Sequence, residues 1–164
     1  MSKEHGFDAR VVWSGNRGSG TSHYRAYDRT WLMAASGKQE IACSNDPALG
    51  GDPGKYNPED LLLSSLSACH MLWYLHLASA AGIIVLSYVD EPIGIGESLP
   101  NGAGRFLRAT LRPRIELAAG TDAIRADELH HEVHKYCFIA RSVSFPISYE
   151  AEYEIAGIAT GAVA

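Results

Sequence analysis

One long helix constrains the fold more than any other segment, and its sequence signals run from Asn57 to Gly82. Asn57 can accept hydrogen bonds from the first free N–H groups, and Pro58 suits the first helical position because its missing N–H costs nothing there. Gly82 suits the left-handed conformation that ends many helices. A helix over residues 58–81 would be roughly 36 Å long, which is long for a chain of 164 residues.

Apolar side chains fall on every side of this predicted helix and not on one stripe. They are Leu61, Leu62, Leu63, Leu66, Ala68, Met71, Leu72, Trp73, Leu75 and Leu77. A helix that is apolar all round must be covered on all sides, and one small sheet covers only one of them. The sequence therefore predicts that a second subunit supplies the rest of the cover, in a homodimer.

The other patterned segments are short strands and one further helix. An apolar stripe predicts a second helix over residues 121–140. Alternating or β-branched patterns predict strands at residues 8–14, 22–34, 39–44, 83–95, 105–117 and 147–155. Because the strands come in hairpin-joined groups, the expected fold class is α+β, with largely antiparallel sheets around the long central helix. We expect one domain over residues 1–164, with residues 156–164 as a frayed tail.

A glycine-rich segment at residues 15–20 has two interpretations. A phosphate-binding loop would end in Gly-Lys-Ser/Thr and lead into an apolar helix, and this segment does neither. A hairpin turn between two strands fits the sequence better.

Charge and hydropathy exclude several classes of function. The formal net charge is −5 and no run of Lys or Arg occurs, which argues against a nucleic-acid partner. The longest strictly apolar runs are far shorter than the ~18 residues that span a membrane, so we expect no membrane partner. Residues 1–6 are polar and unlike a secretory signal, which predicts a cytoplasmic protein.

Three cysteines are present, Cys43, Cys69 and Cys137. In a cytoplasmic protein they are expected to be free, metal-bound or redox-active and not structural disulfides. Cys69 lies in the middle of the long helix, and Cys137 lies on the second predicted helix, four residues before Arg141. Each can be an ordinary buried core cysteine, since free cysteine is among the most buried residue types. Spacing alone does not decide whether Cys69 and Cys137 meet.

Histidines gather on the two predicted helices. On the second helix His130 and His134 share a face, and Cys137 follows three residues after His134. Neutral imidazoles and a thiolate are zinc ligands, so part of a zinc site is one interpretation. The segment lacks paired Cys-x-x-Cys or His-Glu-x-x-His spacing, and solvent-exposed histidines on an amphipathic helix are the other interpretation.

The start of the long helix resembles a family signature. The segment Asn57-Pro58-Glu59-Asp60-Leu61, followed by Cys69 ten residues after Glu59, is similar to the pattern of the OsmC/Ohr family, the osmotically inducible and organic-hydroperoxide-resistance proteins. That family carries a second cysteine before its last strand, where this chain has Cys137. Residues 13–21 are also similar to some members, and the resemblance covers nearly the whole chain.

The resemblance implies a thiol peroxidase that needs no metal or flavin. Cys69 would be the nucleophile that attacks a hydroperoxide and becomes a sulfenic acid, which Cys137 would convert to a disulfide. A dithiol reductant would then reopen the disulfide by exchange. In the family an arginine held by the motif glutamate, here Glu59, stabilises the thiolate, and the family is an intertwined dimer.

The spacing of Glu59 and Cys69 adds a geometric constraint. Ten residues of one straight helix place the two side chains ~15 Å apart along its axis, so one copy cannot bring them together. Two antiparallel copies can place Glu59 of one subunit beside Cys69 of the other. We therefore expect the active sites at the dimer interface.

This sequence departs from the family pattern at several positions. The segment before the long helix, where some members carry the arginine, has only Lys55, which cannot copy the flat bidentate grip of arginine. Other members carry the arginine near the first hairpin, where Arg17 or Arg25 would serve. The bulky residues after Cys69, and Phe138 in place of a common proline, indicate a divergent branch. The alternative function is therefore a dimeric binding protein that holds an apolar ligand beside Cys69.

Overall fold

The computed structural model describes residues 3–157, and its contacts divide the chain into two compact units, residues 1–62 and 63–164. The expectation of one domain stays a prediction. Most of the predicted tail, residues 156–164, lies outside the described residues. The elements comprise two α-helices and several short strands, which confirms the α+β prediction.

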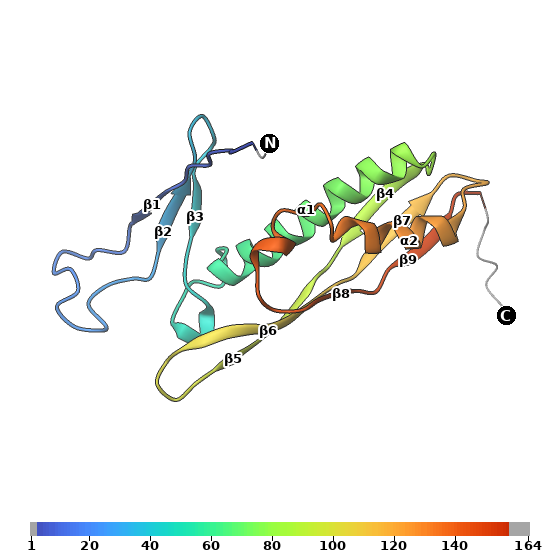
Figure 1. The fold of residues 1–164 in the computed structure, drawn as a ribbon. Helices are drawn as coiled ribbons and strands as arrows, with labels where there is room; N and C mark the ends of the chain where they lie inside the picture. The colour runs from blue at the N-terminus through green and yellow to red at the C-terminus, as the bar shows by residue number, and fades with distance from the viewer. Residues whose placement is uncertain (1–2, 158–164) are drawn as a thin grey trace. The chain divides into compact units, whose positions relative to one another are not determined.

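The first unit is built on a three-stranded antiparallel sheet, which Figure 1 shows in blue to cyan. Strands β1 (Arg10–Trp13), β2 (Trp31–Ala34) and β3 (Ile41–Cys43) pair in chain order. In this register Trp13 lies opposite Trp31, and Trp31 lies opposite Cys43. A 3-10 turn, η1 (Pro47–Leu49), then leads towards the long helix.

The loop between β1 and β2 is longer than the sequence predicted. Asn16 Oδ1 accepts hydrogen bonds from the N–H groups of Gly18 and Gly20, at 2.8 and 3.0 Å, so the glycine-rich segment is a turn and not a phosphate site. The predicted strand at 22–34 is wrong before Trp31. Tyr24 has a strand-like side chain, but its ring lies under the Arg29 guanidinium, 4.1 Å from ring centroid to Cζ, and pairs with no strand.

The long helix α1 (Pro58–Ala80) has the predicted ends and passes from the first unit into the second. At its start Asn57 Oδ1 accepts from the N–H of Asp60 at 2.7 Å, and Asp60 Oδ2 accepts from the N–H of Asn57 at 3.1 Å. This reciprocal cap satisfies two N–H groups that would otherwise lack partners. Beyond its end Gly82 adopts φ +72°, the left-handed conformation that was predicted.

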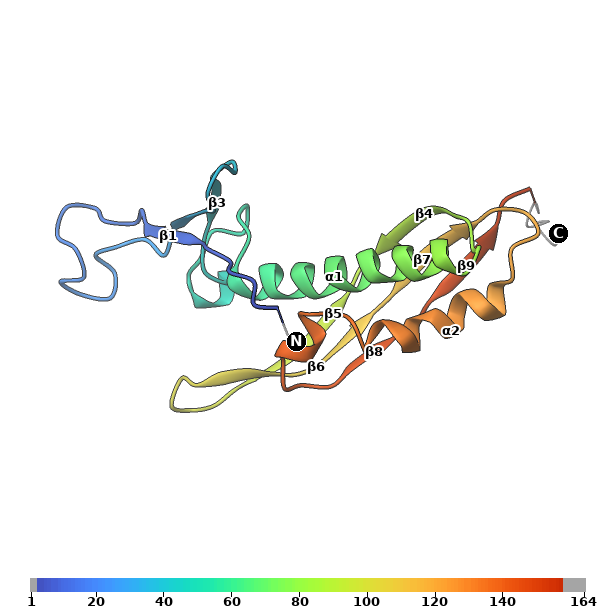
Figure 2. The same ribbon diagram turned by 45° about the horizontal axis from the view of Figure 1, so that its top comes forward.

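The second unit contains two sheets of three strands. The order β5 (Ile93–Ser98), β6 (Gly104–Leu111), β8 (Ile147–Tyr149) forms one sheet. The order β4 (Val85–Asp90), β7 (Pro113–Leu117), β9 (Glu152–Ile155) forms the other, and Figure 2 shows its three strands side by side. The pairs β5–β6 and β4–β7 are antiparallel as predicted, whereas β6–β8 and β7–β9 are parallel.

Three predicted strands are interrupted at the junction of these sheets, at residues 91–92, 112 and 150–151. Asp90 fills the junction, since its carboxylate accepts a hydrogen bond from the N–H of Arg112 at 2.7 Å and another from the Ser67 hydroxyl of α1. The alternation predicted for residues 147–155 is confirmed, because its apolar side chains are half-buried and its polar ones exposed.

The second helix, α2 (Ala123–Val133), begins at the Asp122 cap as predicted but ends seven residues early. Past Val133 the N–H groups of Lys135 and Tyr136 bond three residues back, which tightens the chain into turns. A second 3-10 turn, η2 (Ala140–Ser142), follows. The apolar spacing continues through Cys137 because this segment packs on the same core, and not because the helix continues.

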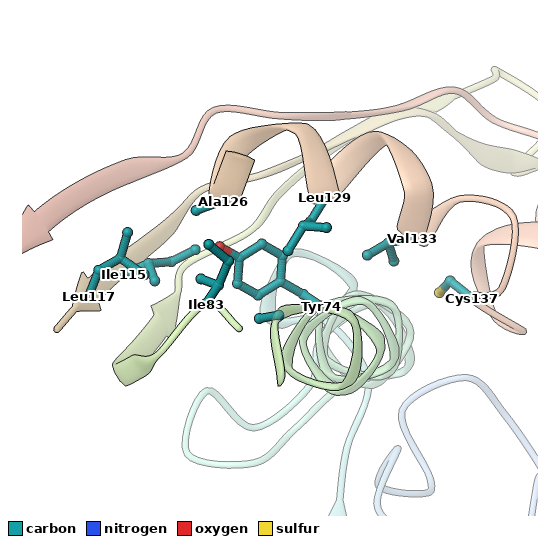
Figure 3. Close-up of a cluster of buried hydrophobic side chains, with 9 residues drawn as sticks. Tyr74, Ile83, Ile115, Leu117, Ala126, Leu129, Val133 and Cys137 are labelled. Carbon is teal, nitrogen blue, oxygen red and sulfur yellow. The ribbon is translucent and has the colours of Figure 1, made fainter. Parts of the chain in front are cut away.

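The main core of the second unit lies between α1, α2 and β7. Its buried members are Tyr74, Ala78, Ile83, Ile115, Leu117, Ala126, Leu129, Val133 and Cys137. Figure 3 shows Tyr74 reaching from α1 towards Leu129 on α2. A smaller cluster joins Leu66 on α1 to Ala109 and Leu111 on β6.

Helix α1 is long and apolar enough, by length and composition, to cross a membrane, with a mean hydropathy of 1.3. This is weak evidence, because core helices of globular proteins meet the same criteria. Here Ser67 bonds to Asp90 on β4, and His70 bonds to His130 on α2, so α1 is joined to its own sheet and helix by polar contacts.

Candidate functional site

Cys69 on α1 and Cys137, in the turn after α2, lie against each other. Cys69 is half-buried on α1 and packs against the core cluster that contains Cys137, which is fully buried. The Cys69 side chain is a near neighbour that raises the pKa of the Cys137 thiol, and both thiols are free. Figure 3 places Cys137 in the turn beyond α2, and not on a helix as predicted. The tertiary packing therefore shows that these two thiols meet, which their spacing in the sequence could not show.

The environments of the two thiols differ. Burial, and to a smaller extent the neighbouring Cys69 side chain, raise the pKa of the Cys137 thiol to about 11. The N–H of Ala140, 3.4 Å from the sulfur, acts in the opposite direction. At neutral pH Cys137 is therefore a protonated thiol. Cys69 is the member of the pair that is partly open to solvent.

A pair of buried histidines lies in the same core, and the sequence analysis missed it. His70 Nε2 and His130 Nδ1 are 2.7 Å apart, with their rings stacked at 5.0 Å between centroids. His130 is also stacked between Tyr74 and Tyr149, at 4.3 and 4.6 Å. The signal was present, because His70 lies four residues after Leu66 and four before Tyr74 on the buried stripe of α1.

Burial keeps both histidines uncharged. Loss of solvent, together with a smaller repulsion from His134, lowers the pKa of His70 to about 4. Loss of solvent, with smaller repulsions from His70, His131 and His134, likewise lowers the pKa of His130 to about 3. Within the described part of the chain, His130 Nε2 has no hydrogen-bond partner. The expectation of solvent-exposed histidines is thus wrong for His130.

No metal centre is formed by the residues that were candidates for zinc. Among residues 3–157, no group of three His, Cys, Asp or Glu side chains is placed to hold a metal ion. His130 points its Nδ1 at His70, so it does not share a site with His134 and Cys137 as the zinc interpretation required.

The charged residues expected near Cys69 lie in the first unit. Glu59 is exposed at the second position of α1, and ten residues of helix separate it from Cys69. Arg17 lies in the loop after β1, where its side chain donates to the carbonyls of Arg25 and Ala26 and pairs with Asp28 at 3.6 Å. Lys55, the other cation considered, pairs with Asp52.

A family model described as OsmC-like protein matches residues 50–152, more than half of the chain. The chain belongs to the OsmC-like protein family. This confirms the resemblance carried by the helix motif and Cys69. None of the curated proteins matches the sequence.

Solved structures with this OsmC-like fold are similar over almost the whole chain. An OsmC-like protein of unknown function from Vibrio cholerae is 26% identical, with a TM-score of 0.80 over 92% of this chain and 99% of that one. An organic hydroperoxide resistance protein from Elizabethkingia anophelis is 17% identical, with a TM-score of 0.68 over 94% and 99%. A Legionella pneumophila protein, also named for organic hydroperoxide resistance, is 16% identical, with a TM-score of 0.66 over 93% and 99%. At these last two identities the likeness shows the fold alone.

Proposed function

We propose that this OsmC-like protein is a cysteine-based peroxidase that reduces organic hydroperoxides. The observation that carries the proposal is the contact between Cys69 and Cys137, two free thiols from distant parts of the sequence. A nucleophilic cysteine with a second thiol in contact is the arrangement that a dithiol peroxidase needs. Family membership, and solved structures of the same fold named for organic hydroperoxide resistance, support the same reaction class.

The reaction proceeds in three balanced steps. The Cys69 thiolate attacks one peroxide oxygen, the O–O bond breaks, and the alcohol leaves with a proton, so that Cys69 becomes a sulfenic acid. The Cys137 sulfur then attacks the Cys69 sulfur, the S–O bond breaks, and water leaves with the thiol proton. A dithiol reductant finally opens the disulfide by exchange and is itself oxidised to a disulfide. No step uses a metal or an organic cofactor.

The different environments of the thiols assign their roles. Cys137 is fully buried, and burial raises its pKa to about 11, so it stays protonated and out of reach of a substrate. Cys69 is half-buried and is the sulfur that a peroxide can approach. Cys69 is therefore the nucleophile and Cys137 the resolving thiol.

Apolar surface near the thiols favours organic hydroperoxides over hydrogen peroxide. Leu72, one turn after Cys69, is 63% exposed. Large exposed apolar side chains gain free energy when they contact an apolar group. Hydrogen peroxide has no such group, whereas the alkyl or aryl part of an organic hydroperoxide does.

Mapping disulfides by mass after peroxide treatment tests this function. The reduced protein is incubated with an organic hydroperoxide, or with hydrogen peroxide, and then digested under conditions that block thiol exchange. We expect a Cys69–Cys137 bridge that forms faster with the organic peroxide, with Cys43 unmodified as the internal control, because Cys43 is buried on β3. Unchanged thiols at Cys69 and Cys137 would rule the peroxidase out.

The working unit is proposed to be a homodimer in the cytoplasm, without nucleic-acid or membrane partners. The support is that a single chain leaves large apolar side chains exposed on α1 and along the edge strands β4 and β5. They are Leu72, Leu86, Val89, Ile93 and Ile95. An exposed apolar edge strand favours pairing with another chain. In this arrangement the partner subunit's Arg17, held by the partner subunit's Glu59, stabilises the Cys69 thiolate.

Solution mass and an arginine variant test the dimer. Light scattering after size exclusion should give about twice the chain mass of 17.7 kDa. Arg17→Ala should lower the rate of Cys69 oxidation at least tenfold, about 1.4 kcal/mol, and Arg17→Lys should restore little because lysine lacks the bidentate grip. Arg10→Ala, an exposed arginine on β1, is the matched control. A monomer with full activity would contradict the shared site.

The alternative function is a binding protein for an apolar ligand. One feature favours it, a cavity of about 310 Å³ at the end of α1, lined by Leu75, Ala78, Ser79, Gly82, Ile83, Ile84 and Val85. Cys69 is not among the lining residues, although the alternative placed the ligand beside it. Persistence of reduced thiols in peroxide, together with a co-purifying apolar molecule, would favour this second function.

A further inference from the structure

An aromatic pair joins the two segments that carry the cysteines. Trp73 lies on α1 one turn after Cys69, and Tyr136 directly precedes Cys137. Their rings are stacked, with centroids 5.0 Å apart and planes inclined by 25°. Trp73 packs against the same core cluster as Cys69, whereas Tyr136 is 46% exposed. The stack therefore reaches from the core to the surface next to the thiol pair.

The turn that carries Cys137 is not part of a helix, so a contact that holds it against α1 matters for its position. Beyond Val133 the chain continues through turns closed by local hydrogen bonds, including Cys137 N–H to Val133 O at 2.9 Å. These bonds shape the turn, but they do not fix it against α1. Cys137, Ile139 and Ala140 pack on the core cluster, but a turn closed by local hydrogen bonds opens more easily than a helix. The Trp73–Tyr136 stack is a contact that this turn makes directly with the helix of Cys69.

We propose that the stacked rings of Trp73 and Tyr136 position Cys137 for disulfide formation with oxidised Cys69. This inference rests on the proposed peroxidase function and adds a positioning role that the chemistry itself does not require. A disulfide forms only when the two Cα atoms come within about 7 Å and the sulfur atoms can approach in line. Holding two reacting groups in that geometry replaces a slow search by a fast intramolecular step.

The rate of disulfide formation decides which product the Cys69 sulfenic acid gives. The Cys69 sulfenic acid can react with the Cys137 thiol, which releases water and gives the disulfide. It can instead react with a second peroxide, which releases an alcohol and gives sulfinic acid, a dead end without a dedicated repair enzyme. By keeping Cys137 in place, the stack favours the first outcome over the second.

The test compares two variants of Tyr136 with one variant of Phe138. Tyr136→Ala removes the stacked ring, Tyr136→Phe keeps it, and Phe138→Ala removes the exposed aromatic ring on the other side of Cys137. Each is treated with a small excess of an organic hydroperoxide, quenched at intervals and analysed by mass for sulfenic acid, disulfide and sulfinic acid. Thermal melts of the reduced proteins show whether each variant is folded.

We expect Tyr136→Ala to oxidise Cys69 at the wild-type rate, to form the disulfide about 10- to 100-fold more slowly, and to accumulate sulfinic acid. Tyr136→Phe and Phe138→Ala should behave like the wild type. Wild-type disulfide kinetics in a folded Tyr136→Ala protein would overturn the positioning role and leave the peroxidase intact. Failure of wild-type Cys69 to oxidise would instead overturn the proposed function. A defect that Phe138→Ala shares would also overturn the role of the stack.

Discussion

Replacing Cys69 by serine is expected to abolish peroxide consumption, with a loss of more than about 1000-fold in rate, or about 4 kcal/mol of transition-state stabilisation. The reason is that the Cys69 thiolate is the proposed nucleophile, and a serine hydroxyl neither ionises near neutral pH nor attacks an O–O bond at a useful rate. Consumption is followed by loss of the organic hydroperoxide in the presence of a small dithiol.

Two further cysteine variants separate nucleophile, resolving thiol and bystander. Cys137→Ser should reduce about one peroxide per subunit and then stop at the sulfenic acid, because no second thiol is in contact with Cys69. Cys43→Ser should turn over like the wild type, since Cys43 lies in the first unit on β3. Full turnover by Cys69→Ser, or a complete loss in Cys43→Ser with the fold intact, would refute the assignment of Cys69.

Acid is expected to destabilise the protein strongly through the His70–His130 pair. In the folded state the pKa of His70 is about 4 and that of His130 about 3, both below the ordinary value of 6.5. Their stabilising contribution is therefore complete above pH 6.5 and is lost as the pH falls towards 4, because the unfolded chain then binds protons that the folded chain does not. At pH 5 each histidine lowers the free energy of unfolding by up to about 2 kcal/mol.

The neighbours of the pair do not offset this loss. The rings that face it, Tyr74 on α1 and Tyr149 and Tyr153 on β8 and β9, are uncharged in acid. His131 on α2 and His134 just after it oppose a charge on His130, whereas the Asp127 carboxylate accepts its hydrogen bond from Tyr153 at 3.2 Å. Tyr88 on β4 lies against Tyr74 and is likewise neutral. The total loss is expected between about 2 and 4 kcal/mol, a large share of a typical domain's stability.

Urea unfolding at pH 7.5, 6 and 5 measures this effect. His130→Phe keeps an aromatic ring between Tyr74 and Tyr149 but removes one titrating group, so its free energy of unfolding should fall about half as steeply with acid. The comparison uses the slope with pH, because the variant also loses its hydrogen bond with His70 and is expected to be less stable at every pH. His5→Gln, at an exposed histidine, is the control and should keep the wild-type slope. Equal slopes in His130→Phe and the wild type would contradict the account.

Local signals in the sequence determined the ends and class of the main elements. The cap formed by Asn57 and Asp60 and the left-handed Gly82 follow from hydrogen bonds and backbone conformations that involve a few adjacent residues. The alternation of residues 147–155 follows from one buried and one exposed face. The same applies to the motif from Asn57 to Cys69, which identified the family and with it the expected chemistry of Cys69.

The tertiary structure decided which of the candidate residues meet. The pattern of residues 121–140 could not show that α2 ends at Val133, because the turns beyond it keep the same apolar residues on the core. Nor could it show that Cys137 contacts Cys69, that His130 contacts His70, or that Tyr136 stacks on Trp73. Each of these contacts joins residues far apart in the chain, and only the packing of α2 and its following turn against α1 sets their distances. The helix that dominates the sequence thus carries Cys69, the proposed nucleophile, and the segment packed against it carries Cys137, the proposed resolving thiol.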